Sequence, residues 1–367
     1  MTSEELESSS SLSPARRTSL RQRLIEWYLR EQRSLPWRES RDAYRIWVSE
    51  SMLQQTRVET VLGYWPRFVE RFPTLVDLAE SDEDDVLAVW SGLGYYSRAR
   101  KLRAAAQVVV KEHGGDFPRT RIQAVALPGV GPYTAGAVLS IAYDLPEALV
   151  DGNVQRVFCR LFGLEDEVGS STLNKQLWSL AEQLVPEQGA GTWNQALMEL
   201  GATVCQARKA NCEECPVSRG CLAKKTGRVA QLPRPKAKRA PTEVELQILV
   251  VKKEGKWLLE QRPTPGRMAG LWQFPTVECA GSEGELFPVG PPKVAGRPIL
   301  EVGEAAGSLR HSITRYRIRA TIHSAQLVEK KPATWRWFQP EELQNLAITG
   351  MARKVLAARN DSAPFRH

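Results

Sequence analysis

The spacing of apolar residues differs between the two ends of this 367-residue chain. Up to about residue 221, apolar residues recur with the period of a helix, as in YRIWVSESMLQQTRVETV (44–61), which predicts amphipathic helices. Beyond residue 242, VELQILVVKK and WLLEQRP read as a hairpin, RYRIRATIH alternates, and TWRWF is rich in strand-forming residues. We therefore expect a multidomain protein, with a mostly α-helical N-terminal region and an α+β C-terminal domain.

The chain exceeds the ~250 to 300 residues at which single cores stop growing, so several domains are expected. The serine-rich start predicts a disordered tail. The stretch LAKKTGRVAQLPRPKAKRAP has seven Lys or Arg, no acids and three prolines, which is typical of a linker. The expected segments are a tail at 1–19, a helical region at 20–221, a basic linker at 222–241, a C-terminal domain at 242–360 and a tail at 361–367.

Composition narrows the class of protein. Apolar residues make up 42% and charged residues 25%, which are ordinary globular values. No run of ~18 apolar residues and no signal-like N-terminus is present, so we expect a soluble, unsecreted, cytoplasmic protein of bacterial type with no membrane partner. The net charge of +8 allows a polyanionic partner without requiring one.

Four of the six cysteines are spaced C-x6-C-x2-C-x5-C, at Cys205, Cys212, Cys215 and Cys221. In a reducing compartment such clustered thiols are metal ligands more often than disulfides. Zinc and an iron-sulfur cluster both suit four thiolates. Zinc ribbons have two short pairs, whereas this stretch has one and spans 17 residues, which favours a single [4Fe-4S] cluster. Cys159 and Cys279 stand apart and are expected to be unligated.

A second signal is the stretch ALPGVGPYTAGAVLSIAY (126–143), in which a helical pattern opens at Pro132. The turn Gly129, Val130 and Gly131 would present amide N–H groups at a helix N-terminus, where a phosphate oxygen can bind. This pattern predicts a helix-hairpin-helix that grips the DNA backbone, and an ordinary helical corner is the alternative. A related stretch, WSGLGYYSRA, occurs at 90–99.

The clamp and the cysteines together resemble the helix-hairpin-helix DNA glycosylases that carry an iron-sulfur cluster. Four further stretches resemble the adenine DNA glycosylase (MutY) branch: RSLPWR (33–38), SESMLQQTRVETV (49–61), GLGYYSRAR (92–100) and VDGNVQRV (150–157). The resemblance implies a six-helix barrel at about 45–140 and a cluster domain built from about 20–44 and 141–221. It also implies duplex DNA with an adenine:8-oxoguanine or adenine:guanine mispair as partner, a monomer, and prevention of G:C to T:A transversions.

Cleaving the bond between adenine and sugar needs an acid for the leaving base and an anion for the charge that develops on the sugar. Glu50 is the candidate acid, because Trp47 and Leu53 lie one turn away on either side and burial would raise its pKa. Asp151 is the candidate anion by resemblance, although it also suits a plain helix N-cap. Asn153 would help to hold it.

Tyr133 stands where related strand-cutting enzymes have a lysine that forms a Schiff base, so base removal without efficient strand cleavage is expected. The target base must leave the stack, and Gln55 and Tyr95 match the family's wedge residues. Plain helix surface and core packing are the alternatives for these two. The residues that match the lining of the adenine pocket are Arg33, Leu35, Trp37, Arg38 and Glu199.

The C-terminal stretch GLWQFP (270–275) resembles the start of a MutT-like (Nudix) domain, but the pyrophosphatase box that should follow is missing. The resemblance implies a reader of 8-oxoguanine rather than a hydrolase. Where the family commonly has Phe-Ser-His, alignment on His311 gives Ile313, Thr314 and Arg315 here. Recognition by this loop is expected, with an edge strand and its turn as the alternative.

The sequence therefore predicts a monofunctional adenine DNA glycosylase that starts base-excision repair. Three other hypotheses remain open: a thymine-glycol glycosylase with lyase activity, a non-catalytic iron-sulfur protein that binds DNA, and a Nudix nucleotide hydrolase. The first is disfavoured by Tyr133, the second by Glu50 and Asp151, and the third by the missing metal box.

Overall fold

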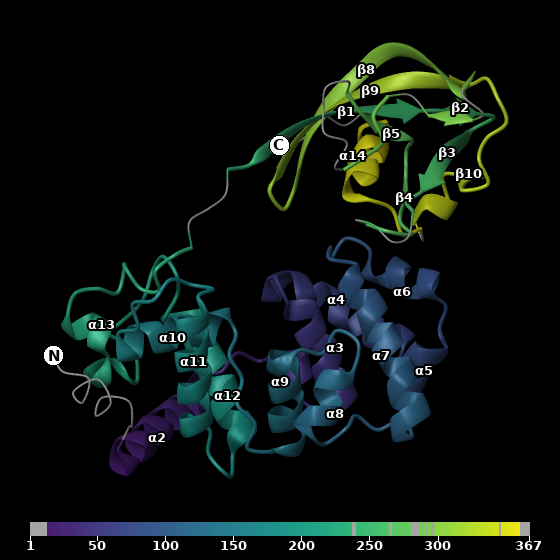
Figure 1. Cartoon of the computed structure of the whole chain (residues 1–367). Helices are drawn as coiled ribbons and strands as arrows, with labels where there is room; N and C mark the ends of the chain where they lie inside the picture. The colour runs from purple at the N-terminus through teal and green to yellow at the C-terminus, as the bar shows by residue number, and fades with distance from the viewer. Residues whose placement is uncertain are drawn as a thin grey trace. The chain divides into compact units, whose positions relative to one another are not determined.

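The computed structural model describes residues 13–236, 240–263, 266, 268–279, 286–290, 292–294, 297–344 and 346–359. The expected C-terminal tail at 361–367 lies outside these residues, as does most of the N-terminal one. The chain forms two compact units (Figure 1). The first contains the described residues up to Glu80 and those from Lys101 to 236, and the second contains 81–100 and the residues after 239.

The first unit is helical, as its apolar spacing predicts. Polar side chains begin several helices: Asp42 accepts from the Arg45 amide at 2.8 Å, and Asp151 accepts from the Val154 amide at 2.7 Å. Its elements are α2 (Pro14–Glu31), η1 (Pro36–Arg38), α3 (Ala43–Leu53), α4 (Val58–Arg71), α5 (Leu75–Glu80), α7 (Ser97–His113, from Lys101), α8 (Arg121–Ala126), α9 (Pro132–Tyr143), α10 (Gly152–Phe162), α11 (Ser171–Leu184), α12 (Ala190–Glu199), η2 (Leu200–Val204), η3 (Ser218–Gly220) and α13 (Leu222–Lys225).

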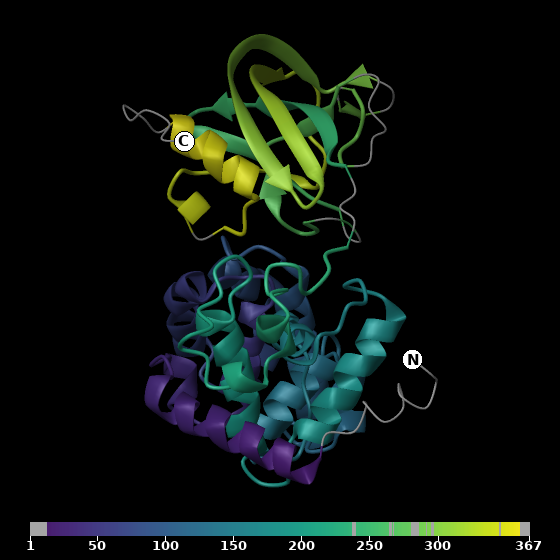
Figure 2. The same cartoon turned by 90° about the vertical axis from the view of Figure 1, so that its left-hand side faces the viewer.

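Helix α9 lies at the centre of this unit and packs against α3, α8 and α12. Its buried face includes Gly136 and Ser140, and the Ser140 hydroxyl accepts from the buried Asn194 amide of α12 at 2.8 Å. A second apolar core joins segments distant in sequence, because Leu24 and Trp27 of α2 share it with residues of α10, α11 and α12. Figure 2 shows α2 running along one side of this group of helices.

The N-terminal tail is shorter than predicted, because residues 14–19 are helical. Ser13 caps α2 through the Arg16 amide at 3.4 Å, and Pro14 occupies its first position. Arg21 then donates to the carbonyls of Leu184, Gln183 and Val185 at 2.7 to 3.2 Å. These contacts with the end of α11 are long-range, and the serine-rich composition gave no sign of them.

The linker predicted at 222–241 is also wrong for its larger part. Residues 222–225 form α13, and Leu232 is buried. The Arg160 guanidinium donates to the Leu232 carbonyl at 2.9 Å, and the Val168 amide donates to the Arg234 carbonyl at 2.9 Å. Because of these contacts, residues 222–236 belong to the helical unit. The basic, proline-rich composition of the stretch did not indicate them.

The second unit has the mixed architecture that the alternating pattern predicts. One sheet has the order β5-β1-β9-β8, and a second has β10-β3-β2 with β4 beside β3. Helix α14 covers the inner face of the first sheet, where its Met351 and Val355 join the apolar core (Figure 2). Its elements are α6 (Glu83–Trp90), β1 (Thr242–Val250), β2 (Lys252–Lys253), β3 (Lys256–Gln261), β4 (Trp272–Gln273), β5 (Thr276–Glu278), β6 (Lys293–Val294), β7 (Arg297–Pro298), β8 (Leu300–Ile313), β9 (Tyr316–Leu327), β10 (Trp335–Phe338), η4 (Glu342–Gln344) and α14 (Gly350–Arg359).

The predicted hairpin between VELQILVVKK and WLLEQRP exists only in part. Short β2 pairs with β3 across Glu254 and Gly255, both of which have positive φ. The long strand β1 instead pairs in parallel with β9 and antiparallel with β5. β1 therefore belongs to a different sheet from β2 and β3. The alternation of residues along a strand does not indicate which strand it pairs with. Within the described residues, no helix combines the length and apolar content needed to cross a bilayer.

The close packing of α9 against the segment after it makes a stability prediction possible. A Cβ at Gly136 would lie 2.2 Å from the Ala148 carbonyl oxygen, whereas a Cβ at Gly63 of α4 meets nothing within 4 Å. We expect Gly136→Ala to destabilise the protein by about 1 to 3 kcal/mol. Gly63→Ala should be neutral or stabilise by up to about 1 kcal/mol. Denaturant unfolding of both variants checks this, and equal stabilities would contradict the packing described.

Candidate active site

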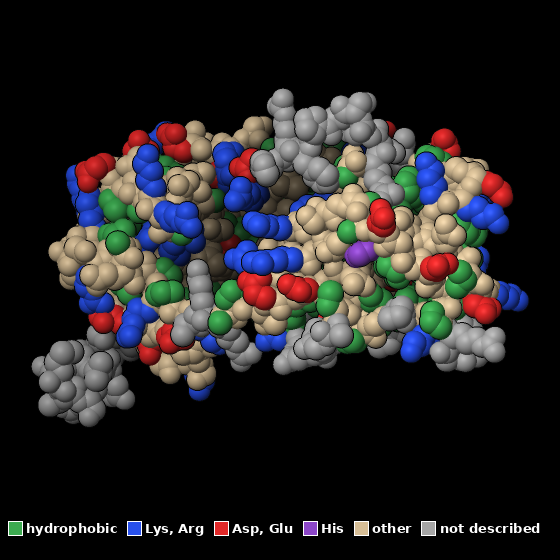
Figure 3. Space-filling model, turned by 90° about the horizontal axis from the view of Figure 1, so that it is seen from above, with side chains coloured by type: hydrophobic (Ala, Val, Ile, Leu, Met, Phe, Trp, Pro, Cys, Tyr) green, Lys and Arg blue, Asp and Glu red, His purple; other side chains and the backbone are tan. Residues whose placement is uncertain are grey.

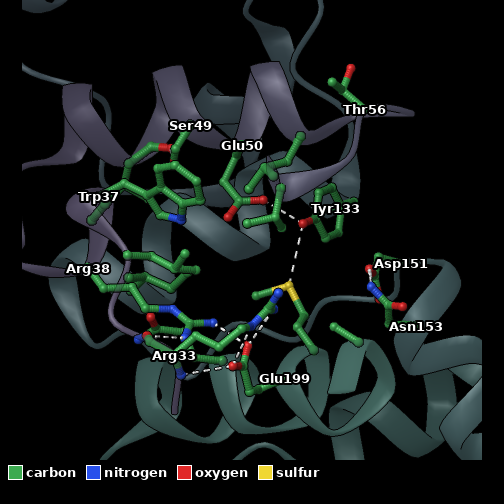
Figure 4. Close-up of a pocket in the computed structure, with 18 residues that line it drawn as sticks. Arg33, Trp37, Arg38, Ser49, Glu50, Thr56, Tyr133, Asp151, Asn153 and Glu199 are labelled. Atoms are coloured by element: carbon green, nitrogen blue, oxygen red, sulfur yellow. Dashed lines mark hydrogen bonds and ion pairs between the residues drawn. The ribbon is translucent and has the colours of Figure 1, made fainter. Parts of the chain in front are cut away.

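A cavity of about 160 Å³ in the helical unit gathers every residue predicted for catalysis and for the adenine pocket. Figure 4 shows Glu50 on α3 and Tyr133 on α9 pointing toward one another, with Asp151 and Asn153 beyond Tyr133. The arginines and Glu199 lie on the opposite wall (Figure 4). The predicted residues in its lining are Arg33, Leu35, Trp37, Arg38, Glu50, Tyr133, Asp151, Asn153 and Glu199.

Glu50 is a buried carboxyl, with 5% of its surface exposed. Burial raises the pKa of Glu50 to about 7, and the hydrogen bond that the Tyr133 hydroxyl donates to it at 2.5 Å lowers the pKa against that trend. The charge of Asp151 adds to the rise. Leu53, one of the two expected neighbours, lines the cavity together with Trp37, whereas Trp47 is buried and packs edge-on against Phe117.

Asp151 is the N-cap of α10, as the alternative interpretation states, and it also lines the cavity. Its carboxylate accepts from the Val154 amide at 2.7 Å and from the Asn153 side chain at 2.9 Å. Burial raises the pKa of Asp151, while these hydrogen bonds and the charge of Arg156 lower it against that trend. The anion is thus held in place by donors on its own helix.

A network connects this wall to the cysteines. Arg156 of α10 donates to the Asn153 side chain at 2.8 Å, the Gly201 carbonyl at 2.7 Å and the Cys205 carbonyl at 2.7 Å. A Cβ at Gly201 would lie 2.5 Å from the Asn153 Cβ, so η2 and α10 are in direct contact. Asn153 is therefore oriented both by Asp151 and by the segment that carries the first cysteine.

Glu199 has the opposite electrostatic environment to Glu50. Its side chain is 1% exposed and pairs with Arg33 at 2.8 Å and with Arg38 at 2.7 Å. Burial alone would raise the pKa of Glu199, but hydrogen bonds from Arg33 and Arg38 outweigh it and lower the pKa to about 2. This carboxylate stays ionised and fixes both guanidinium groups at the cavity wall.

Several lining residues were not predicted. Met198 lies beside Glu199 in the sequence, and its sulfur accepts a hydrogen bond from the Tyr133 hydroxyl at 3.4 Å. Thr56 and Val58 belong to SESMLQQTRVETV (49–61), one of the stretches that resemble the family. Their position in that motif was the sequence signal that could have identified them as lining residues. The unpredicted lining residues are Ile46, Ser49, Leu53, Thr56, Val58, Ile141, Gln195, Met198 and Ala202.

The predicted DNA-contacting residues lie outside this cavity. The hairpin joins α8 to α9 as expected, with Gly129 at φ 78°. The Val130 side chain is buried, and its amide donates to the Leu127 carbonyl at 3.1 Å, so neither is available to a ligand. A Cβ at Gly129 would lie 2.7 Å from that of Lys101, whose side chain therefore packs over the turn.

Both predicted wedge residues have a strained backbone. Gln55 follows α3 with φ 58° and is exposed, and Tyr95 between α6 and α7 has φ 49° and 48% exposure. Non-glycine residues with positive φ are uncommon and concentrate at functional sites. The neighbouring Gln54 side chain donates to the Thr134 hydroxyl of α9 at 3.2 Å, which anchors the Gln55 turn.

The four clustered cysteines line one small cavity of the helical unit, together with Arg160 and Lys224. All four are free thiols. Arg160 donates to the Cys205 sulfur at 3.3 Å, and burial raises the pKa of Cys215 to about 12. Among the described residues, no set of three His, Cys, Asp or Glu is arranged to hold a metal ion. Cys159 is buried in α10, away from this set.

The predicted loop of the second unit is the turn between β8 and β9. Ile313 pairs with Tyr316, so Thr314 and Arg315 form a two-residue connection. Thr314 has φ 51°, although glycine usually holds that position in such turns. The Arg315 guanidinium lies 5.0 Å from the centre of the Tyr316 ring. β8 is an edge strand, as the alternative interpretation states.

Comparison with known proteins agrees with both units. Residues 48–183 match the HhH-GPD superfamily base excision DNA repair protein model, and residues 247–358 match the NUDIX domain model. The chain is 37% identical to an adenine DNA glycosylase of Rattus norvegicus, over 92% of this chain and 77% of that one. One of Buchnera aphidicola is 33% identical over 70% of this chain and 74% of its own.

The chain belongs to the adenine DNA glycosylase family. It is therefore a DNA glycosylase of base-excision repair that hydrolyses N-glycosyl bonds to adenine. The helical unit also resembles a solved thermostable thymine-DNA glycosylase, at 31% identity with a TM-score of 0.52 over 57% of this chain and 97% of that one. The predicted fold class is confirmed: a helical glycosylase region is followed by a Nudix-like domain.

The Glu199 network predicts a pH-dependent loss of stability. Glu199→Gln should lower the free energy of unfolding at pH 7 by about 3 kcal/mol, because two guanidinium groups lose a buried partner. The pKa of Glu199 is depressed to about 2, so its stabilisation is present above the unfolded value of 4.5 and is lost as the pH falls from there toward 2. The gap between wild type and variant should close over that range.

Denaturant titrations at several pH values measure this gap. Glu31→Gln is the control, because Glu31 is 57% exposed and its contact with Arg30 is 3.8 Å long. That variant should change stability by less than about 1 kcal/mol. A Glu199→Gln gap that stays constant down to pH 2 would show that the charge of Glu199 is not what matters.

Proposed function

We propose that this enzyme removes adenine paired with 8-oxoguanine or guanine from duplex DNA and leaves an abasic site without cutting the strand. The observation that carries the proposal is a buried carboxyl, Glu50, whose pKa is about 7 and which shares a cavity with the second carboxyl, Asp151. Two carboxyls in different environments can supply an acid and an anion at the same pH. The lining residues that the structure describes include no lysine, and Tyr133 stands beside Glu50.

In this mechanism Glu50 donates its proton to the leaving adenine. Half of it is protonated near pH 7, which suits a general acid. Tyr133 holds the carboxyl through its hydroxyl and orients the proton toward the cavity. The pKa of Tyr133 is raised well above its ordinary value by burial and by both carboxyls, so its hydroxyl stays protonated and donates.

Asp151 stabilises the positive charge that develops on the sugar as the bond to adenine breaks. Its donors from Val154 and Asn153 keep the carboxylate at one position, so little reorganisation is needed in the transition state. Arg33 and Arg38, fixed by Glu199, present N–H donors on the opposite wall, where the extruded base would lie. Water attack on the sugar then completes hydrolysis.

Duplex DNA is the substrate, so the adenine must leave the base stack before it reaches this buried cavity. Gln55 and Tyr95 are the proposed wedge residues, and their strained backbones support this role. The exposed Lys101 side chain over the hairpin adds a positive charge where the Gly129 turn would meet a phosphate.

The second unit is proposed to read 8-oxoguanine through Ile313, Thr314 and Arg315. The strained Thr314 at the tip of β8 and β9 supports a functional loop, because a β-branched residue rarely adopts positive φ. Arg310 and Arg319 are direct neighbours on the outward face of these strands, near Arg317. Figure 3 shows that face, where basic and acidic side chains both lie. Arg317 and Arg319 are also register partners of Glu243 and Glu245 on β1, so the charges on this face are mixed.

We also propose that the four cysteines hold a [4Fe-4S] cluster, a proposal supported by the cavity that all four line and by the hydrogen bond from Arg160 to one sulfur. Cys205, Cys212, Cys215 and Cys221 would hold it. Burial raises the pKa of the Cys215 thiol, and a bound metal would favour its thiolate form. The cluster would stabilise this end of the helical unit, where Arg156 connects the Cys205 carbonyl to Asn153.

Single-turnover assays test the function on duplexes with adenine opposite 8-oxoguanine, adenine opposite guanine, thymine glycol opposite adenine, and thymine opposite guanine. We expect strands with adenine opposite 8-oxoguanine to break only after hot alkali, and Glu50→Gln to lower the rate at least about a thousandfold through loss of the proton donor. Breakage of thymine glycol strands without alkali would instead favour the lyase hypothesis.

The pH profile of the same rate separates an acid from a structural carboxyl. Since Glu50 must be protonated, the rate should fall about tenfold per pH unit above its pKa of about 7. Glu213→Gln is a matched control, because Glu213 is 88% exposed and pairs with Lys224 away from the cavity. A flat profile from pH 6 to 9 would contradict the assignment.

The cluster is tested on the purified full-length protein. An iron-sulfur protein should be yellow-brown, absorb near ~400 nm and contain about four iron atoms per chain. A colourless protein with one zinc would favour the alternative site. Cys159→Ser should leave the spectrum unchanged, whereas Cys212→Ser should weaken it, because only the second residue lines the cysteine cavity.

A further inference from the structure

The guanidinium of Arg121 joins three segments of the helical unit. It stands at the first position of α8 and donates to the Glu147 carboxylate at 2.5 Å, the Ala148 carbonyl at 2.7 Å and the Pro132 carbonyl at 3.3 Å. Pro132 directly follows the hairpin, and Ala148 precedes Asp151 by three residues. One side chain therefore contacts both the start of α9 and the segment that leads to the candidate anion.

The contacted segment has little freedom elsewhere. Asp144, at the end of α9, accepts from the amides of Gly189 and Gly191 at 2.8 and 3.1 Å. The buried Asn194 side chain donates to the Glu147 carbonyl at 2.8 Å. These contacts fix the path of the chain up to residue 147. Beyond it, the Ala148 carbonyl has the Arg121 contact and the close approach of Gly136.

We propose that Arg121 is a positioning residue for adenine excision, which sets the position of Asp151 relative to the hairpin that grips the DNA backbone. The inference rests on the proposed role of Asp151. The three residues from Ala148 to Asp151 span at most roughly 10 Å of extended chain, so a displacement at Ala148 carries to the carboxylate with little slack. The hairpin fixes the DNA, and Arg121 fixes the anion to the same helix pair.

The chemistry of Arg121 suits a residue that holds several segments in fixed positions. Its planar fork satisfies a carboxylate and two backbone carbonyls at once, which a lysine cannot reproduce. Its guanidinium also lies 5.6 Å from the centre of the Trp178 ring of α11, so the planar group has a contact on its face as well. A simple ion pair between Arg121 and Glu147 would not require the contacts with the two carbonyls and the Trp178 ring.

The test compares binding of two DNA duplexes by the full-length protein. One carries a cationic pyrrolidine abasic analogue opposite 8-oxoguanine, and the other carries a neutral tetrahydrofuran analogue. A fixed Asp151 should favour the cationic probe. We expect Arg121→Ala to reduce this preference and the single-turnover excision rate by about tenfold each, the effect of losing about 1.4 kcal/mol of transition-state stabilisation. Binding of the neutral duplex should change less than about twofold.

Arg119→Ala is the matched control, because Arg119 has the same charge two residues away and instead lies over the Tyr143 ring at 4.7 Å. It should leave the preference unchanged. If Arg121→Ala does not fold, Arg121→Lys and Glu147→Gln are measured instead. Both should reduce the preference for the cationic probe. Equal weakening of both probes, or an unchanged preference with Arg121→Ala, overturns the role of Arg121 alone. If wild-type protein has no cationic preference, the assignment of Asp151 fails, and that of Arg121 with it.

Discussion

The site depends on how closely other segments approach helix α9. A Cβ at Gly136 would lie 2.2 Å from the Ala148 carbonyl oxygen, and one at Gly191 of α12 would lie 2.5 Å from that of Ser140. Only glycine permits backbone contact at these distances. As a result, α12 and the segment leading to Asp151 lie directly against α9. Tyr133 on the first turn of α9 can then reach Glu50 on α3 and Met198 on α12 together. The turn between α8 and α9 directly precedes Tyr133, so the predicted hairpin and the cavity lie on the same helix.

Glu50 and Glu199 are both buried, and the groups around each one decide whether its carboxyl is protonated. Glu50 has one neutral donor, and burial dominates, so its pKa rises to about 7. Glu199 is as buried but meets two guanidinium groups, so its pKa falls to about 2. The two residues line the same cavity. A carboxyl with a pKa of about 7 and a carboxylate that stays ionised therefore line one cavity, because only Glu199 accepts hydrogen bonds from two guanidinium groups.

Sequence reasoning located the cavity residues well because they lie in short motifs with matching local structure. The turn before Pro132, the N-cap at Asp151 and the C-x6-C-x2-C-x5-C spacing are all local features. Long-range contacts were not accessible in this way. Arg21 of α2 binds the end of α11, and Arg160 of α10 binds the Leu232 carbonyl within the predicted linker. Likewise, β1 reads as half of a hairpin, but its partners are β5 and β9. Pairing partners depend on chain segments that local periodicity does not describe.

Three non-glycine residues at the predicted DNA-contacting positions have a backbone conformation that lowers the stability of the fold. Gln55, Tyr95 and Thr314 have φ near +50 to +60° without being glycine. Each costs roughly 1 to 3 kcal/mol, which surrounding contacts must offset. For Gln55 the anchor is the Gln54 bond to Thr134, and for Thr314 it is the pairing of Ile313 with Tyr316 directly at the turn. Glycine would relieve the strain at any of these places but would remove the side chain. Asp144, Glu254 and Met268 also have positive φ, so the backbone conformation alone does not distinguish these three positions from ordinary turns.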